Sequence, residues 1–162
     1  MTLSHLDDAG RARMVDVSHK DATERSARAE GRIRLSREAY AAVERNSGPK
    51  GDVMSTAELA GVLGAKRTAA LIPLCHPIGL DHVRVTARLD GALPGIRVEA
   101  RATAVGRTGV EMEALTAVAV SLLTVYDMVK ATGYEMEIER IRLVEKTGGK
   151  SGHWARTDEE SQ

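Results

Sequence analysis

The sequence of 162 residues predicts a single α+β domain in which helices pack on one face of a mainly antiparallel sheet. Two observations predict it. Four segments alternate apolar and polar residues with the two-residue period of a strand, and three others open with the capping signals of helices. These segments follow the order strand, helix, helix, strand, strand, helix, strand. This order matches βαββαβ with one additional helix, which is the ferredoxin-like two-layer sandwich.

The first strand is predicted over residues 28–35, where alanine, glycine, isoleucine and leucine alternate with charged residues. Ser36 follows directly and has the side chain that favours an N-cap. A short helix is therefore expected from there to about Arg45.

A second helix is signalled by the capping box Ser55-x-x-Glu58 and is expected to run to about Leu71, where Pro73 stops it. Small residues recur along one face of this helix at spacings of three or four positions: Ala57, Gly61, Gly64 and Thr68. Interior glycines weaken a helix by about 1 kcal/mol each, which indicates that another backbone packs closely there. Close packing between subunits would fit this small-residue face.

The next two strands alternate over residues 83–90 and 96–103, and the glycine-rich segment 91–95 between them indicates a hairpin loop. A final strand is expected over 136–143. Its alternation slips by one residue at Glu139-Arg140, which predicts a β-bulge.

The last helix is predicted from the cap signal Thr108-x-x-Glu111 to Lys130, with Gly133 just beyond it as a stop. As the third residue after Thr108, Glu111 is expected to return a hydrogen bond to the cap. The apolar stretch from Ala114 to Tyr126 is too short for a membrane span, so it indicates a buried helix.

Composition and charge narrow the functional classes. Twenty-three basic residues balance twenty-three acidic ones, which is not the charge of a general nucleic-acid binder, so any anion must be held locally. The single cysteine cannot form an internal disulfide and the first ten residues lack an apolar run, so we expect a cytoplasmic protein without a membrane segment. Residues 1–26 are expected to form an N-terminal arm, 27–152 a single catalytic domain, and 153–162 a polar tail.

Two carboxylates lie on the otherwise apolar helix over 110–130, in a narrow stripe that includes Glu113 and Asp127. Either they pair with arginines of the sheet or they face a site. They are fourteen residues apart, hence about 21 Å along the axis, so both cannot reach one compact reacting centre. Two copies of the chain that share a pocket would bring them together.

Other candidates have both structural and functional interpretations. Cys75 and His76 lie between two prolines in a stiff segment, as a buried thiol and imidazole or as parts of a site, and their spacing to His82 matches no common zinc site. No metal site is predicted. The run Lys146-Thr-Gly-Gly-Lys-Ser151 lacks the first glycine of a Walker motif, but it can still hold phosphate through backbone N–H groups and charge.

Five of these stretches resemble, in order and spacing, the signatures of the cyclic pyranopterin monophosphate synthase family of molybdenum cofactor biosynthesis. They are Lys50-Gly-Asp-Val53, Leu71-Ile-Pro-Leu-Cys-His-Pro77, Thr108-Gly-Val-Glu-Met-Glu-Ala-Leu-Thr116, Tyr126-Asp-Met128 with Lys130, and Gly148-Gly-Lys-Ser-Gly152. Met14-Val-Asp-Val-Ser18 also fits, so that the resemblance covers roughly residues 5–152.

The resemblance implies a phosphorus-oxygen lyase that rearranges a cyclised dihydroguanosine triphosphate into cyclic pyranopterin monophosphate and releases pyrophosphate. It implies no cofactor, apart from Mg²⁺ that the triphosphate can carry. It also implies a homohexamer, a trimer of dimers with pockets between chains. Two alternatives stay open, a non-catalytic binder of nucleotides or phosphopterins and an RNA-binding module, although a chain with so few aromatic residues fits the latter poorly.

Site residues follow from the matched motifs and from the demand of a polyphosphate for cations. Catalysis is assigned to Asp127, as the proton-transfer group, together with Lys50 and Lys130. The expected substrate-binding residues are Leu74, Cys75, His76, Met112, Glu113, Lys20, Arg25, Lys66 and Lys146.

Overall fold

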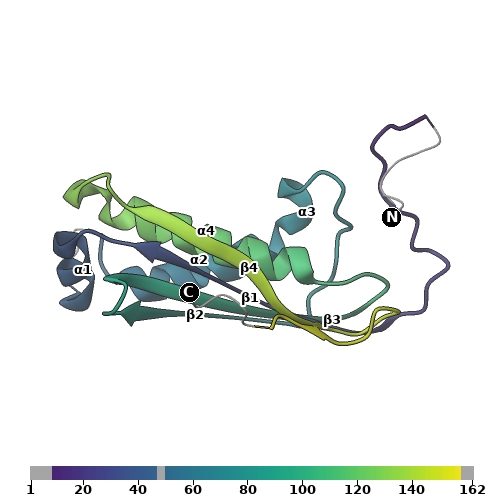
Figure 1. The fold of residues 1–162 in the computed structure, drawn as a ribbon. Helices are drawn as coiled ribbons and strands as arrows, with labels where there is room; N and C mark the ends of the chain where they lie inside the picture. Colours follow the sequence, from purple (N-terminus) through teal and green to yellow (C-terminus); the bar gives the residue numbers. More distant parts are fainter. Residues whose placement is uncertain (1–8, 47–49, 158–162) are drawn as a thin grey trace.

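A computed structural model describes residues 9–46 and 50–157 and confirms the α+β, ferredoxin-like fold, with α2 and α4 on one side of an antiparallel sheet (Figure 1). The strand order is β2-β3-β1-β4-β5. The elements are β1 Thr23–Arg34, α1 Arg37–Glu44, α2 Val53–Lys66, α3 Thr68–Leu71, β2 His82–Asp90, β3 Gly95–Gly106, α4 Glu111–Val129, the 3₁₀ turn η1 Lys130–Thr132, β4 Glu137–Thr147 and β5 Trp154–Ala155.

Two strands reach into segments expected to be terminal arm or tail. β1 begins at Thr23, five residues before the predicted start, and pairs along its whole length with β3. β5 was not predicted; Trp154 lies opposite Lys146 of β4. The ends of the chain, 1–8 and 158–162, lie outside the described residues.

One of the three predicted helix N-caps is found in the structure, and the other two are not. The Ser36 hydroxyl accepts from the backbone N–H of Ala39 at 3.1 Å, so this cap is confirmed. The capping box at Ser55 is wrong, because Asp52 caps α2 instead and its carboxylate accepts from the Ser55 N–H at 3.0 Å. The Glu58 carboxylate accepts from the backbone N–H of Ala87 in β2 at 2.9 Å instead of capping its own helix. This bond joins α2 to the edge strand of the sheet.

The cap predicted at Thr108 is also wrong. Helix α4 begins two residues later, with Val110 at the N-cap and no side-chain cap. Glu111 is therefore free of the capping role expected for it, and its carboxylate lies 3.7 Å from the ammonium of Lys146.

The small-residue face of α2 packs against α4 of the same chain, so the predicted packing between subunits at this face is wrong. A Cβ on Gly61 would lie 2.9 Å from the carbonyl oxygen of Ala117, closer than real Cβ contacts allow. The Ser121 hydroxyl donates to the carbonyl of Ala57 at 2.8 Å across the same contact. The two helices thus touch almost backbone to backbone.

Helix α4 is the central element of the core. The segment Glu111–Thr132 is long and apolar enough to cross a membrane by length and composition, yet 56% of its most apolar window is buried inside the fold. Its inner side packs on the sheet through Val118, Leu122 and Val125, which are fully buried. This is the buried helix that the sequence predicts.

The phase slip in the last strand is confirmed as a β-bulge. Arg140 and Ile141 of β4 together lie opposite Gly31 of β1, and Arg140 has a left-handed backbone with φ 54°. The bulge lies where α4 crosses the sheet. A Cβ added to Gly31 would lie only 2.8 Å from the Val118 side chain of α4, so the helix passes close to the strand there.

Candidate active site

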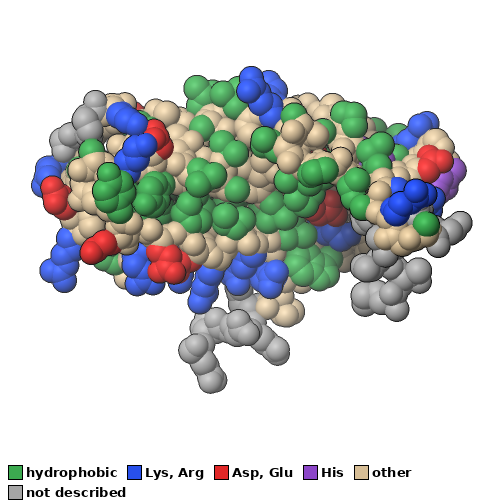
Figure 2. Space-filling model, turned by 90° about the horizontal axis from the view of Figure 1, so that it is seen from above, with side chains coloured by type: hydrophobic (Ala, Val, Ile, Leu, Met, Phe, Trp, Pro, Cys, Tyr) green, Lys and Arg blue, Asp and Glu red, His purple; other side chains and the backbone are tan. Residues whose placement is uncertain are grey.

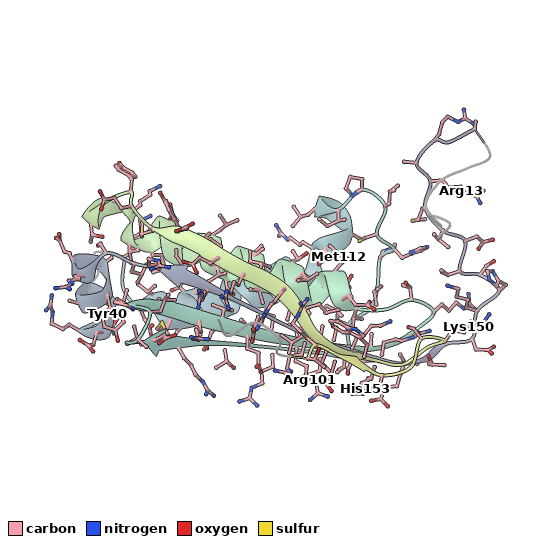
Figure 3. The ribbon with its side chains drawn as sticks, in the orientation of Figure 1. Arg13, Tyr40, Arg101, Met112, Lys150 and His153 are labelled. Carbon is pink, nitrogen blue, oxygen red and sulfur yellow. The ribbon has the colours of Figure 1, made fainter. Side chains whose placement is uncertain are left out.

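A cavity of about 280 Å³ lies at the N-terminal end of α4. Met112 marks this end of the helix in Figure 3. Three separate segments line the cavity: the N-terminal arm, the loop between α3 and β2, and the start of α4. Its lining includes six of the predicted substrate-binding residues: Lys20, Leu74, Cys75, His76, Met112 and Glu113. The structure therefore brings these six together from distant parts of the sequence.

The proline-bracketed loop holds its side chains in place through local bonds. Ile72 is extended, as a residue before proline must be, and its carbonyl accepts from the Cys75 N–H at 3.1 Å. The His76 Nε2–H donates to the carbonyl of Val15 at 2.7 Å, which fastens the arm over the cavity. Two arm residues, Val15 and Val17, line the site from this side, and no periodic pattern in the sequence pointed to them.

Glu113 is the buried charge of this cavity. Its side chain is only 3% exposed, and Oε2 has no hydrogen-bond partner within the described part of the chain. Burial raises the pKa of the Glu113 carboxyl, with a smaller contribution from the charge of Glu111. Burial also raises the pKa of the Cys75 thiol, and the nearby Glu113 adds to this shift. An unpartnered buried carboxyl is costly, so its presence indicates a site that a ligand completes.

Basic side chains gather near the same end of the sheet. Lys146 of β4 donates to the Ser151 hydroxyl and lies near Glu111, which lines the cavity. Arg25 of β1 donates to the carbonyl of Gly106 at 3.3 Å. Lys150 lies on the neighbouring turn (Figure 3). Lys66 is exposed at the C-terminal end of α2 and does not line the cavity.

The three predicted catalytic residues form a second group at the opposite end of α4. The Asp127 carboxylate accepts from the ammonium groups of Lys50 at 2.6 Å and Lys130 at 2.7 Å. Hydrogen bonds from Lys130 and then Lys50 lower the pKa of Asp127 to about 2. Its side chain is 55% exposed, so this group faces solvent in one chain.

Neither carboxylate pairs with arginines of the sheet, the structural alternative that the sequence left open. Asp127 pairs with lysines and Glu113 Oε2 is unpaired within residues 9–46 and 50–157. Since the two residues are about 21 Å apart along α4, one chain does not bring the two groups together.

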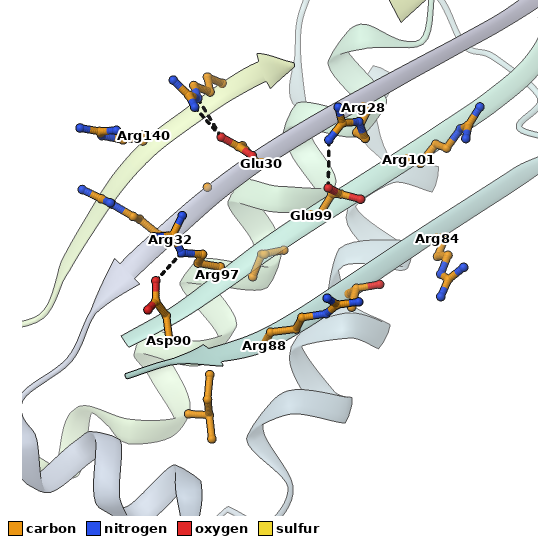
Figure 4. A pocket seen from close by; sticks show the side chains of 15 residues that line it. Arg28, Glu30, Arg32, Arg84, Arg88, Asp90, Arg97, Glu99, Arg101 and Arg140 are labelled. Carbon is orange, nitrogen blue, oxygen red and sulfur yellow. Dashed lines mark hydrogen bonds and ion pairs between the residues drawn. The ribbon is translucent and has the colours of Figure 1, made fainter. Parts of the chain in front are cut away.

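A larger cavity of about 710 Å³ lies on the open face of the sheet, away from the helices (Figure 4). Eight arginines and three carboxylates line it, and none is a predicted site residue. Each of the three carboxylates has an arginine partner: Glu30 with Arg142, Glu99 with Arg28 and Asp90 with Arg97. The smaller cavity is the candidate site, because it gathers six predicted site residues whereas the larger one gathers none.

Comparison with known proteins identifies the family of this chain. The MoaC family profile matches residues 14–149, which span both groups of site residues. The chain is 56% identical over 156 residues to a cyclic pyranopterin monophosphate synthase of Brucella ovis, covering 96% of this chain and 94% of the relative. It is 58% identical over 154 residues to the protein of the same name from a Methylobacterium species, covering 95% and 96%. With a match of this extent, the chain belongs to the MoaC family.

Proposed function

We propose that this chain is a cyclic pyranopterin monophosphate synthase, a lyase in molybdenum cofactor biosynthesis. Its substrate is 3′,8-cyclo-7,8-dihydroguanosine 5′-triphosphate, and its products are cyclic pyranopterin monophosphate and pyrophosphate. The observation that carries the proposal is the convergence of six predicted substrate-binding residues on one cavity. This cavity contains a buried carboxyl, Glu113, whose Oε2 has no hydrogen-bond partner among the described residues.

The cavity suits the guanine-derived end of such a substrate. The purine-like ring of the substrate is flat, partly apolar and carries N–H donors. The Glu113 carboxyl offers an acceptor oxygen that lacks a partner in the described chain. Leu74 and Met112 supply apolar surface beside it. The fixed donor on His76 holds the arm and thereby helps to close the cavity against water.

The triphosphate requires cations, and this neutral chain gathers them around the same end of the sheet. Lys20 lines the cavity, while Lys146 lies near one of its lining residues. Arg25 and Lys66 extend the basic surroundings in the proposal. Their charges would stabilise the negative charge that develops on the pyrophosphate leaving group.

Proton transfer is assigned to Asp127, Lys50 and Lys130. The Asp127 carboxylate is the acceptor in this group, and each lysine is an ammonium donor within hydrogen-bond distance of it. To act on a substrate held near Glu113, this group must come from another chain. We therefore retain a homohexamer, a trimer of dimers with pockets between chains, as part of the proposal.

The protein's own groups supply this chemistry without a resident cofactor in our proposal, and any Mg²⁺ would arrive with the triphosphate. The expected location is the cytoplasm, and the expected ligand is a small molecule rather than a nucleic acid.

The test is turnover by the purified protein of the cyclised triphosphate, with pyrophosphate and pterin products followed in parallel. Both products should appear together, and Asp127→Ala should keep the fold and assembly but release no pyrophosphate. Substrate that binds without forming either product would favour the alternative, a non-catalytic binder of nucleotides or phosphopterins.

A further inference from the structure

The open face of the sheet carries a concentrated positive charge. Its cavity is lined by eight arginines and three carboxylates, a formal excess of five positive charges in a chain that is neutral overall. The other side of the molecule differs, because Figure 2, which looks down on the helical layer, shows hydrophobic side chains gathered along it. The positive charge is therefore a property of this one face and not of the surface in general.

The strand register sorts most of these arginines into two rows that cross β2, β3 and β1. The first row holds Arg84, Arg101 and Arg28, and the second, four residues further along the strands, holds Arg88, Arg97 and Arg32. Neighbours within a row have Cα atoms about 5 Å apart, and the two rows are about 13 Å apart. Like charges directly opposite one another destabilise a sheet, so each row favours an anion that neutralises it.

Half of the arginines in this cavity have no acidic partner in the described part of the chain. The four that are paired bind nearby carboxylates, as Arg28 with Glu99, Arg32 with Glu139, Arg97 with Asp90 and Arg142 with Glu30. The four that form no ion pair within residues 9–46 and 50–157 are Arg84, Arg88, Arg101 and Arg140, all of them exposed (Figure 4). Arg84 and Arg101 face each other in the first row, and Arg88 lies in the second.

The chemistry of the lining indicates the class of ligand. A guanidinium group donates two parallel hydrogen bonds to a phosphate, and two such groups on adjacent strands can share one phosphate. The lining contains no aromatic side chain, and its larger apolar side chains are only Leu89 and Val98. A ligand with a base or an apolar body would find little to pack on there. The cavity therefore suits a small anion of high charge.

The spacing of the rows indicates how long this anion is. A single phosphate can bridge neighbours within a row but cannot span the distance of about 13 Å between rows. A chain of linked phosphates can contact both rows, and each further contact then forms within one complex. The cavity volume of about 710 Å³ leaves room for such a chain.

We propose that the open face of the sheet binds a linear oligophosphate, a chain of phosphate groups joined by anhydride bonds and without an attached base. Arg84 and Arg101 bind phosphate in the first row, Arg88 binds it in the second, and Arg140 adds charge at the rim. This site shares no lining residue with the substrate cavity and does not depend on the proposed function.

Isothermal titration calorimetry of the purified protein tests the site with three inorganic probes: tripolyphosphate, pyrophosphate and orthophosphate. In low salt and without Mg²⁺, the affinity should rise with chain length, and tripolyphosphate should bind about tenfold or more tighter than orthophosphate. Added NaCl should weaken the binding, since the side chains are exposed. Equal affinities for tripolyphosphate and orthophosphate would overturn the proposal.

Variants locate the binding. Arg101→Gln should weaken tripolyphosphate binding by about tenfold or more, and Arg101→Lys by less, because lysine keeps the charge but not the paired donors. The matched control is Arg37→Gln, which removes the same charge from an exposed position at the start of α1 outside this cavity and should change the affinity less than about twofold. Circular dichroism should be unchanged in all three. Equal losses in Arg101→Gln and Arg37→Gln would show a general charge effect and overturn the site.

The substrate cavity is a second place where tripolyphosphate can bind, and Lys146→Ala distinguishes the two. This variant should keep the binding that Arg101→Gln removes. If Lys146→Ala abolishes the binding and Arg101→Gln leaves it intact, the anion binds only in the substrate cavity and the proposal is wrong. ATP should bind no tighter than tripolyphosphate, and a clearly tighter ATP complex that depends on Arg101 would overturn the assignment to an anion without a base.

The site and the proposed function fail separately. Arg101→Gln should turn over the cyclised triphosphate as the unmodified protein does when no oligophosphate is added. If the unmodified protein releases no pyrophosphate while Arg101→Gln loses tripolyphosphate binding, the proposed function fails and the oligophosphate site stands. If turnover is normal and no variant of the sheet face changes tripolyphosphate binding, the proposed function stands and the site is wrong.

Discussion

Replacing Glu113 by glutamine is predicted to stabilise the fold at neutral pH while it weakens substrate binding. The carboxyl is buried and one of its oxygens has no partner in the described chain, so its charge is held at a cost. Leaving such a group unsatisfied costs about 1–3 kcal/mol. Glutamine keeps the shape without the charge, so the gain should be about 1–2 kcal/mol, or roughly 2–8 °C in melting temperature for a chain of this size.

The pH dependence has a definite sign. Burial raises the folded-state pKa of Glu113 above its ordinary value of 4.5. Between the ordinary pKa, which applies to the unfolded chain, and the raised folded-state pKa, Glu113 is protonated in the folded protein and ionised in the unfolded chain. The free energy of unfolding therefore falls as the pH rises through this window. The Glu113→Gln variant does not lose stability in this way, because glutamine does not ionise. The difference in unfolding free energy between variant and parent should therefore grow from acidic to neutral pH and then level off.

Urea denaturation of the ligand-free protein between pH 4 and pH 8 measures this difference. The matched control is Glu111→Gln, two residues away on the same helix, where the carboxylate lies near Lys146 and is half-buried. That change should be neutral or slightly destabilising, since it removes a favourable ion pair. A Glu113→Gln protein that is less stable than its parent at pH 7, or a difference that does not vary with pH, would refute the reasoning.

The remaining predictions concern packing and charge. Gly61→Ala should destabilise the protein by about 1–3 kcal/mol through overpacking against α4, despite a helix-propensity gain of about 1 kcal/mol. Gly79→Ala, whose Cβ meets open space, is the control, and equal denaturation midpoints for the two would contradict the close helix contact. Because hydrogen bonds lower the pKa of Asp127 to about 2, its contribution to stability should be present above the ordinary value of 3.8 and be lost as the pH falls through about 2. Lys50→Ala should raise this pKa in an NMR titration of the carboxyl; an unchanged value would show that the pairing is absent in solution.

Local patterns predicted most of the fold because they act over a few residues. The alternation of β1 and the cap at Ser36 depend on immediate neighbours, and both were found. The caps at Ser55 and Thr108 were wrong because the sequence offers competing residues, and tertiary contacts choose among them. Glu58, for example, serves the edge strand rather than its own helix. The two-residue strand β5 is too short for any periodic signal.

The site was predictable in part. Spacing along one helix placed Glu113 and Asp127 too far apart for one centre, and the structure keeps them at opposite ends of α4. The convergence of the arm, the proline-bracketed loop and the start of α4 depends on pairing between distant segments, which periodicity does not report. The arginine-lined sheet face was missed because its residues occupy the polar phase of each strand, where solvent exposure is the ordinary interpretation.

The central claim is that each cavity is completed by a neighbouring chain, and mixing two inactive variants tests it most directly. Glu113→Ala and Asp127→Ala chains would be denatured together in equal amounts, refolded, and assayed for pyrophosphate release. In a two-fold dimer with shared sites, half of the dimers are mixed and each holds one intact site, so activity should return to about a quarter of that of the unmodified protein. If both groups acted within one chain, no site would be intact, and a verified mixture with no activity would contradict the account.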